Sequence, residues 1–169
     1  MKTLYLIRHA KSSWDFPNLS DFERPLNERG QRDAPFMGKL LSERIKSPQI
    51  IYSSPAKRAI TTAEIIAEFL GYDVNSIIKN ENIYEAAVSD LMRIINNNSD
   101  EYSSLMLFGH NPGFTLISNY LADKKITNLP TCGFVQIDFN LNSWNNIEGS
   151  SGNLMHFEYP KKYINEEKD

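Results

Sequence analysis

The dipeptide Arg8-His9 places a fixed positive charge beside an imidazole, directly after the short apolar run Leu4 to Ile7. An apolar run this short, bounded by charge, predicts a buried strand. Strand ends deliver side chains into the crevice at the edge of an α/β sheet, where ligands bind. Burying a guanidinium there is unfavourable unless an anion meets it. The pair therefore indicates an anion site, although alone it is also common on ordinary surfaces.

Two further motifs follow apolar runs of their own. Residues 53–58 read Ser-Ser-Pro-Ala-Lys-Arg and end on Arg58, and residues 109–113 read Gly-His-Asn-Pro-Gly and contain His110. Arg58 falls in the first turn of the next expected helix, where a cation gains nothing from the helix dipole but a bound phosphate does. His110 precedes a sharp turn that exposes it. Both motifs are thus expected to present polar groups to a ligand.

These residue types form a set for phosphoryl transfer. In a doubly wound sheet their strand ends converge on one crevice. Guanidinium groups offer planar forks for phosphate oxygens. One imidazole can attack phosphorus while the other donates to the charge that builds on the equatorial oxygens. The set requires no metal or cofactor, and it consists of Arg8, His9, Arg58 and His110. The remaining histidine, His156, lies in a late alternating segment without polar neighbours and is interpreted as structural.

Length and composition are typical of one soluble globular domain. The 169 residues are 41% apolar and 23% charged, and a single domain is expected over 1–164 with a charged tail over 165–169. A net charge of −3 without a long basic run argues against a nucleic-acid binder. The one cysteine, Cys132, excludes an internal disulfide and a thiolate metal cluster. No apolar segment suits a signal peptide or a membrane span, so a cytoplasmic protein without membrane partners is expected.

Strand-like runs alternate with helical patterns along the chain. Strands are expected over 3–7, 49–52, 82–84, 105–108, 134–139 and 153–159. Helices are expected from Glu28 with Asn27 as cap, over 56–70, after a Ser89 cap, and over 114–121. Pro35 interrupts the first helical pattern, which leaves that boundary open, and Pro48 ends it. The polar stretch 8–26, which contains Trp14 and Phe16, is interpreted as a functional loop.

The order of these elements predicts the fold class. Helices between the early strands require crossover connections, which favour parallel pairing. The last two strands are joined by an Asn-, Ser- and Gly-rich turn and can form a hairpin. We therefore expect an α/β protein, a three-layer α/β/α sandwich around a mostly parallel, mixed sheet. Whether residues 142–152 touch substrate or merely turn stays open.

The motifs resemble, in order and spacing, those of the histidine phosphatase (phosphoglycerate mutase-like) superfamily. The resemblance covers roughly the first two-thirds of the chain, through residues 4–12, 24–30, 53–59, 62–63, 84–86 and 109–111. Ala10 where many members carry Gly, the Lys-Ser-Ser-Trp continuation and the small size resemble the SixA-type phosphohistidine phosphatase branch. The resemblance implies the phosphoglycerate mutase-like sandwich and no required metal. It further implies that His9 is the nucleophile, with Arg8, Arg58 and His110 forming the phosphate pocket.

The proton donor is a separate question. Glu85 is the candidate general acid by its order along the chain, and it is equally an acidic residue near a helix cap. A phosphoramidate needs little help from an acid, because its leaving nitrogen is protonated more readily than an alkoxide. Ser13, Asn27 and Asn111 are candidates to bind phosphate at the mouth or to orient the imidazoles. Asn27 could also serve only as a helix cap.

The expected function is a phosphatase that removes phosphate from phosphohistidine in a protein, such as a phosphotransfer domain. Only the segments 11–22 and 72–85 remain to roof the pocket, and an open pocket suits a phosphoryl group that projects from a protein surface. The alternatives are a phosphatase for small phosphomonoesters with Glu85 as acid, a non-catalytic phosphoprotein-binding module, and a mutase. A monomer would suffice for any of these, and the oligomeric state stays open.

Overall fold

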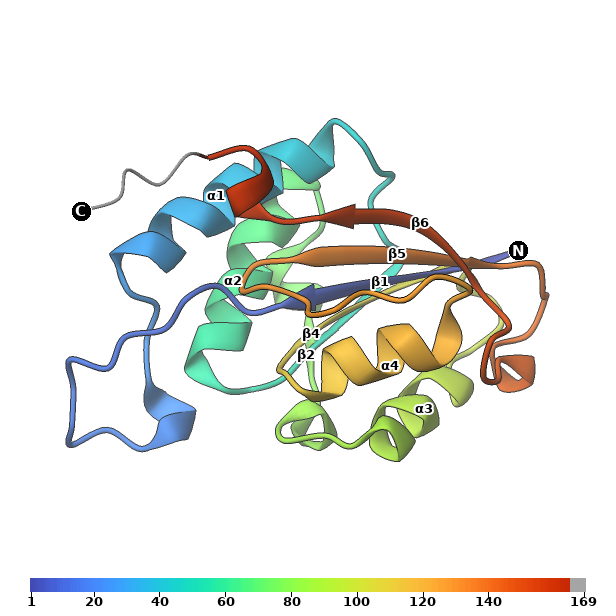
Figure 1. Cartoon of the computed structure of the whole chain (residues 1–169), viewed down its shortest axis with the longest axis horizontal. Helices are drawn as coiled ribbons and strands as arrows, with labels where there is room; N and C mark the ends of the chain where they lie inside the picture. Colours follow the sequence, from blue (N-terminus) through green and yellow to red (C-terminus); the bar gives the residue numbers. More distant parts are fainter. Residues whose placement is uncertain (165–169) are drawn as a thin grey trace.

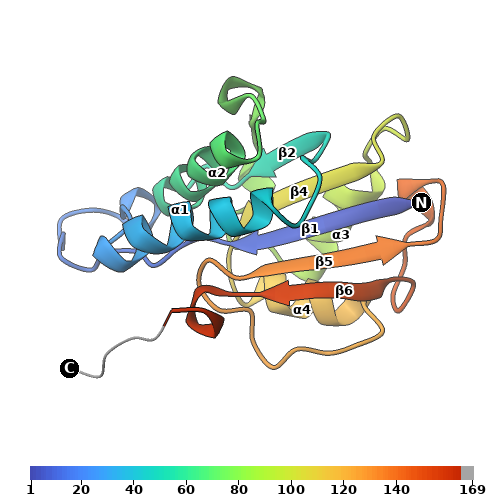
Figure 2. The ribbon, with the colours of Figure 1, turned by 90° about the horizontal axis from the view of Figure 1, so that it is seen from above.

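The computed structural model describes residues 1–164, and the charged tail expected over 165–169 lies outside them. Among the described residues a six-stranded sheet has the order β3-β2-β4-β1-β5-β6 (Figures 1 and 2). Neighbours from β3 to β1 pair in parallel, whereas β5 is antiparallel to both β1 and β6. The strands are β1 (Lys2–Arg8), β2 (Ile50–Ser53), β3 (Ile78–Lys79), β4 (Ser104–Gly109), β5 (Phe134–Phe139) and β6 (Asn153–Glu158).

Helices cover both faces of the sheet (Figure 2). On one face lie α1 (Glu28–Ser42) and α2 (Lys57–Phe69), and on the other α3 (Val88–Asn96) and α4 (Gly113–Leu121). Side chains alternate along β1, so that Leu4 and Leu6 join the core under α3 and α4, whereas Tyr5 and Ile7 join the core under α1 and α2. The expected three-layer sandwich on a mixed sheet is confirmed. No α-helix within residues 1–164 is long and apolar enough to cross a membrane.

Two expected boundaries in the middle of the chain were wrong. The strand expected over 82–84 is a 3-10 turn, Glu81–Ile83, because the side chain of Asn80 accepts from the amide of Asn82 and bends the backbone. The neighbouring strand β3 forms earlier. Helix α3 does not begin at a Ser89 cap: Ala87 is the cap residue, and the carboxylate of Asp90 reaches back to the amide of Ala87 at 2.9 Å. Ser89 lies inside the first turn.

Helix α1 begins as expected but ends before Pro48. The side-chain oxygen of Asn27 accepts from the amide of Gly30 at 2.9 Å, which is the expected cap. Pro35 lies inside this helix, which continues past it to Ser42. The later helix start that Pro35 suggested is therefore wrong, because the helix begins at Glu28 and runs through Pro35.

The carboxyl ends of β1, β2 and β4 meet at one edge of the sheet. The amide of His9 donates to the carbonyl of Gly109 at 3.0 Å, and the amide of Ser54 donates to the carbonyl of Phe108 at 2.9 Å. These bonds continue the pairing just beyond the strands. As a result, the residues that follow each strand lie side by side, which the crevice rule for α/β sheets anticipates.

The antiparallel strands β5 and β6 carry the chain from the carboxyl end of β1 to its amino end and back. Lys2 pairs with Phe139, so the turn over residues 142–152 lies at the amino end of β1, opposite His9, and does not touch the site. Strand β6 then returns, with Glu158 opposite Phe134. The short 3-10 helix Pro160–Lys162 therefore follows at the same edge as His9.

Candidate active site

His9 follows β1 and is buried, with 8% of its surface exposed. Its Nδ1 lies 2.7 Å from the carbonyl oxygen of Ala10. Because a carbonyl can only accept, Nδ1 carries the proton and donates, which leaves the lone pair of the neutral ring on Nε2. The amide of Ala10 is itself held by the Thr62 hydroxyl at 3.0 Å, and this hydroxyl donates to the carbonyl of Arg58. The tautomer of His9 is thus set by the backbone and braced by α2.

The surroundings of His9 keep the ring uncharged. Burial lowers its pKa to about 3, the hydrogen bond to Ala10 acts in the opposite direction, and His110, Arg58 and Arg8 lower the pKa further. An unprotonated Nε2 is the form that can attack an electrophilic phosphorus. At neutral pH the free protein therefore already holds His9 in its nucleophilic form.

Arg58 lies in the first turn of α2 and points toward His9. Its Nε is 3.4 Å from His9 Nε2, which agrees with a lone pair on that atom. Its Nη1 donates to the carbonyl of Asp21 at 2.6 Å and its Nη2 to the Asp21 carboxylate at 3.0 Å. The guanidinium is therefore buried and held rigidly beside the imidazole, in an orientation that suits a phosphate oxygen.

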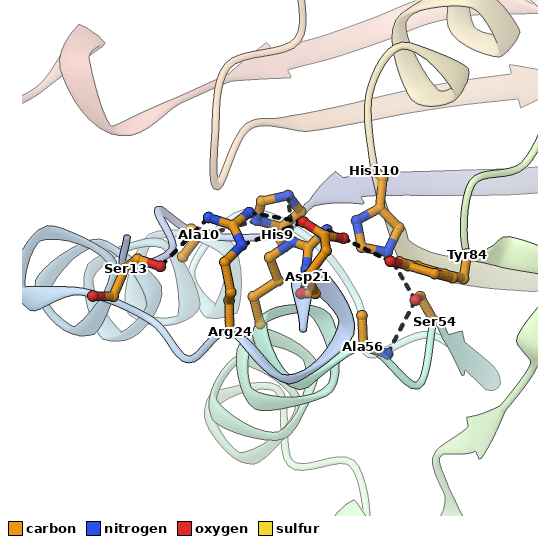
Figure 3. Close-up of polar contacts among 10 residues, drawn as sticks. His9, Ala10, Ser13, Asp21, Arg24, Ser54, Ala56, Tyr84 and His110 are labelled. Carbon is orange, nitrogen blue, oxygen red and sulfur yellow. Dashed lines mark hydrogen bonds and ion pairs between the residues drawn. The ribbon is translucent and has the colours of Figure 1, made fainter. Parts of the chain in front are cut away.

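His110 follows β4, and its ring centroid is 5.1 Å from that of His9 (Figure 3). Its Nε2 is 2.8 Å from the hydroxyl of Ser54, which already accepts from the amide of Ala56. We assign the hydroxyl proton to this contact, so Nδ1 of His110 carries the ring proton. Nδ1 is buried without a partner among the described residues. Burial and Arg58 lower the pKa of His110 to about 4.

Arg8 supplies a second unsatisfied donor. Its Nη1 donates to the carbonyl of Leu129 at 3.0 Å, whereas its buried Nε has no partner among the described residues. Burial and then Arg29 lower the pKa of Arg8. Buried donors without acceptors are rare in folded proteins and indicate a missing ligand. Arg8, His9, Arg58 and His110 all line one cavity of about 160 Å³, which we call the catalytic pocket.

Asp21 links the loop before α1 to this pocket (Figure 3). Besides Arg58, its carboxylate accepts from the Tyr84 hydroxyl at 2.6 Å and from Arg24 Nε at 3.3 Å. The Tyr84 bond lowers the pKa of Asp21 to about 2, burial acts against it, and Arg58 and Arg24 lower it further. The Tyr84 ring also contacts the His110 ring edge-on, with centroids 5.4 Å apart. Asp21 is therefore an anion that holds both sides of the pocket together.

Arg24 and Trp14 form the outer wall. The Arg24 guanidinium lies 3.6 Å from the Trp14 ring centroid, and its Nη1 donates to the carbonyl of Ser13. Trp14 is 73% exposed, although it lines the pocket. A cation stacked on an indole is stabilised without losing its charge, so this wall presents a positive group and an aromatic face to whatever binds.

The structure brings five of the eight candidate site residues together. Asn111 lines the catalytic pocket with Arg8, His9, Arg58 and His110, although its side chain bonds to Asn128, Leu129 and Thr115.

The other three candidates, Ser13, Asn27 and Glu85, do not line the catalytic pocket. Ser13 accepts from the amide of Asp15, and its neighbour Ser12 lines the pocket instead. Asn27 caps α1. Glu85 is exposed, has a φ of 55° and does not line the pocket.

Several contributing residues were missed from the sequence. Arg24 and Tyr84 stand within motifs that supported the family resemblance, and that signal could have marked them. Asp21 carried no comparable signal, because its role depends on loop geometry. Within residues 1–164, no three His, Cys, Asp or Glu side chains gather as a metal-binding group.

Comparison with known families matches residues 4–107 to the histidine phosphatase superfamily (branch 1). An uncharacterised chloroplast protein of Arabidopsis thaliana is 33% identical over 159 residues, which is 89% of this chain and 72% of that protein. A 2,3-bisphosphoglycerate-dependent phosphoglycerate mutase of Bartonella tribocorum is 36% identical over 102 residues, which is 59% of this chain but 48% of the mutase.

Solved structures share the fold over most of the chain. A protein assigned as the phosphohistidine phosphatase SixA of Agrobacterium tumefaciens has a TM-score of 0.78 at 27% identity, covering 94% of this chain and 98% of that one. The protein histidine phosphatase SixA complexed with tungstate has a TM-score of 0.81 at 18% identity, covering 96% and 99%. The second likeness concerns the fold alone.

Lowering the pH should destabilise the fold through its buried imidazoles. Below the unfolded pKa near 6.5 the unfolded chain takes up protons, whereas folded His9 resists them down to about pH 3. The free energy of unfolding then falls by up to about 1.4 kcal/mol per pH unit for each such group. We expect His9→Gln to reduce this slope in urea unfolding between pH 7 and 5. His156→Gln, at an exposed position of β6, is the control. If the free energy of unfolding of His9→Gln depended on pH as steeply as that of the wild type, the lowered pKa of His9 would be contradicted.

Removing the charge of Asp21 should strengthen anion binding. The carboxylate lies 3.0 Å from Arg58 and opposes any anion bound there. We expect Asp21→Asn to bind inorganic phosphate roughly tenfold more tightly, equivalent to about 1.4 kcal/mol, in titration calorimetry. Asp15→Asn, an exposed site in the same loop, is the matched control. Weaker binding by Asp21→Asn would instead mean that the carboxylate is needed to hold Arg58.

Proposed function

The chain belongs to the histidine phosphatase superfamily, and from that premise we propose that it is a metal-independent phosphatase that works through a covalent phosphohistidine on His9. The observation that carries the proposal is the unprotonated Nε2 of His9, fixed 3.4 Å from Arg58 Nε. Beside it, the unpaired Nδ1 of His110 offers a hydrogen-bond donor. A nucleophile with donors already in place for the phosphoryl oxygens is what such a reaction requires.

The reaction has two halves. In the first, His9 Nε2 attacks phosphorus, a new N–P bond forms, and the bond to the leaving group breaks, its electron pair departing with that group. In the second, water attacks the phosphorus of phospho-His9, inorganic phosphate leaves, and Nε2 recovers its lone pair. Arg8 and Arg58 neutralise the phosphoryl oxygens throughout, and His110 Nδ1 donates to the charge that builds on them.

The proposed substrate is phosphohistidine in a protein. The catalytic pocket, at about 160 Å³, is smaller than the roughly 300–1,000 Å³ of sites that enclose whole ligands. It has room for a phosphoryl group and little of its carrier. The carrier would therefore remain outside, as it does when the phosphoryl group is attached to a protein surface.

The available acids also favour a phosphoramidate. Asp21 is the carboxylate that pairs with Arg58, and its pKa of about 2 makes it a poor proton donor at neutral pH. Glu85 is exposed and outside the pocket. A leaving imidazole nitrogen can be protonated from solvent, whereas an alkoxide depends on a positioned acid. The SixA proteins with this fold carry the same substrate class in their names.

A phosphatase for small phosphomonoesters is the second candidate. The similarity to phosphoglycerate mutases, whose substrates are phosphate esters by name, favours it. It needs Glu85 to move toward the pocket and act as acid. A phosphoprotein-binding module without turnover is less well supported, because the nucleophile and its donors are all in place.

Replacement of the nucleophile tests the mechanism. We expect His9→Ala to lower turnover by at least about a thousandfold and to abolish acid-labile phosphorylation of the enzyme, since His9 Nε2 supplies the lone pair that attacks phosphorus. Radiolabelled phosphohistidine peptide provides both measurements. His156→Ala is the control and should behave as the wild type. Turnover that survives in His9→Ala would rule out the covalent mechanism.

Replacement of Glu85 separates the two substrate classes. We expect Glu85→Gln to change kcat/KM for a phosphoramidate by less than about threefold, because the side chain lies outside the pocket. The same variant is assayed on phosphoserine, whose alkoxide leaving group needs an acid. Glu81→Gln, an exposed neighbour, is the control. A large loss on phosphoserine alone would favour the phosphomonoester alternative.

A further inference from the structure

Ser54, in the motif that follows β2, is buried, with 0% of its surface exposed. Its hydroxyl makes two hydrogen-bonding contacts among the described residues: it accepts from the amide of Ala56 at 3.2 Å and lies 2.8 Å from Nε2 of His110 (Figure 3). A serine hydroxyl carries one proton, and an amide N–H can only donate. The hydroxyl proton of Ser54 is therefore left for His110.

The opposite tautomer of His110 would leave two polar groups without partners. With the ring proton on Nε2, the hydroxyl proton of Ser54 would have no acceptor within residues 1–164, and Nδ1 would present a lone pair to a pocket lined by arginines that suits anions. A buried hydroxyl proton without an acceptor is unfavourable. With the ring proton on Nδ1, the bond from Ser54 forms, and what remains unsatisfied is an N–H donor that an anion can accept.

Sheet pairing fixes the position of Ser54 relative to this ring. Ser53 of β2 pairs with Phe108 of β4, and the next amide, that of Ser54, donates to the carbonyl of Phe108 at 2.9 Å. Ala56, whose amide donates to the hydroxyl, is the cap residue at the start of α2. The hydroxyl is thus held between the ends of two paired strands and the start of a helix, so it offers its proton to Nε2 in one fixed direction.

The hydrogen bonds run in one direction, from the backbone toward the pocket. The amide of Ala56 donates to Ser54, Ser54 donates to Nε2 of His110, and the buried Nδ1 has no partner in the part of the chain that the structure describes. Each bond in such a chain polarises the next one and strengthens its donor. Burial and Arg58 lower the pKa of His110 to about 4, so the ring is neutral at pH 7 and carries a single proton.

We propose that Ser54 is a positioning residue of the phosphatase reaction, which holds His110 in the tautomer that presents Nδ1–H to the phosphoryl oxygens. The proposal rests on the phosphatase function above and deepens it, because Ser54 does not itself line the catalytic pocket and acts through His110, which does. No proton changes place: the hydroxyl keeps its proton, and so does Nδ1. The donor is then oriented before the substrate arrives, and nothing has to reorganise as charge builds on the phosphoryl oxygens.

Removal of the hydroxyl tests this role in turnover. We expect Ser54→Ala to lower kcat for a phosphohistidine peptide about tenfold and to change KM by less than about threefold, because the charge that His110 meets builds mainly in the transition state. Ser53→Ala is the matched control: Ser53 is also 0% exposed, and its hydroxyl donates to the carbonyl of Ser54 at 2.9 Å and not to a histidine. Ser54→Thr keeps the hydroxyl and should retain most of kcat.

The tautomer itself is read by NMR of the full chain with isotopically labelled histidine nitrogens, at neutral pH and without substrate. We expect His110 of the wild type to carry its proton on Nδ1, Ser54→Ala to populate both tautomers, and Ser53→Ala to match the wild type. The signals that disappear in His110→Gln are those of His110. A purely structural role of Ser54 would lower stability without moving the proton between the two nitrogens. A proton on Nε2 in the wild type would overturn the proposal, whether or not the variants fold.

Titration with inorganic phosphate in the same NMR measurement keeps this proposal separate from the proposed function. Phosphate should shift the Nδ1 signal of wild-type His110, and the shift should be smaller in Ser54→Ala. If the wild type hydrolyses no phosphohistidine peptide while these signals behave as expected, the phosphatase proposal fails and Ser54 still positions His110 toward a bound anion. In an active wild type, a change of tautomer in Ser54→Ala without loss of kcat would overturn the role of Ser54, as would an equal loss of kcat in Ser53→Ala.

Discussion

The hydrogen bond from Nδ1 of His9 to the carbonyl of Ala10 is the interaction on which the site depends. It decides which nitrogen of the ring carries the proton and therefore leaves Nε2 with the lone pair. Burial keeps that ring neutral, and the Thr62 hydroxyl accepts from the amide of Ala10, the residue whose carbonyl accepts the bond from His9. A ring that was free to rotate or to exchange tautomers would offer the lone pair to phosphorus only part of the time.

The cations around His9 favour binding of an anion, but they destabilise the free protein because they repel one another. Arg8, Arg58 and Arg24 are held close together before any ligand is bound, and their mutual repulsion must be limited for the fold to be stable. Asp21 limits it by accepting from both Arg24 and Arg58 while Tyr84 holds its carboxylate. The same charge opposes an incoming anion, so stability of the free protein and affinity for phosphate are set against each other at this residue.

Two neighbouring cavities result from one feature of the sheet. The parallel strands deliver the catalytic residues to a single edge, and the antiparallel pair β5 and β6 carries the chain away from that edge and back again. The returning segment, through Pro160 and Lys161, lines a larger cavity of about 420 Å³ next to Arg8. The larger cavity therefore combines Arg8, which also lines the catalytic pocket, with residues about 150 positions later in the sequence.

Local pattern by itself determined most of the fold and the chemical type of the site. Period and turn residues located β1, β5 and the helices, because burial on one or both faces dictates where apolar side chains recur. The strand-end motifs identified the residues that the structure gathers in the pocket. Only the tertiary structure decided that Glu85 faces solvent, that Ser12 rather than Ser13 lines the pocket, and that Asp21 joins Arg58 to Tyr84. These outcomes depend on loop conformation and on contacts between distant segments, and neither leaves a periodic trace in the sequence.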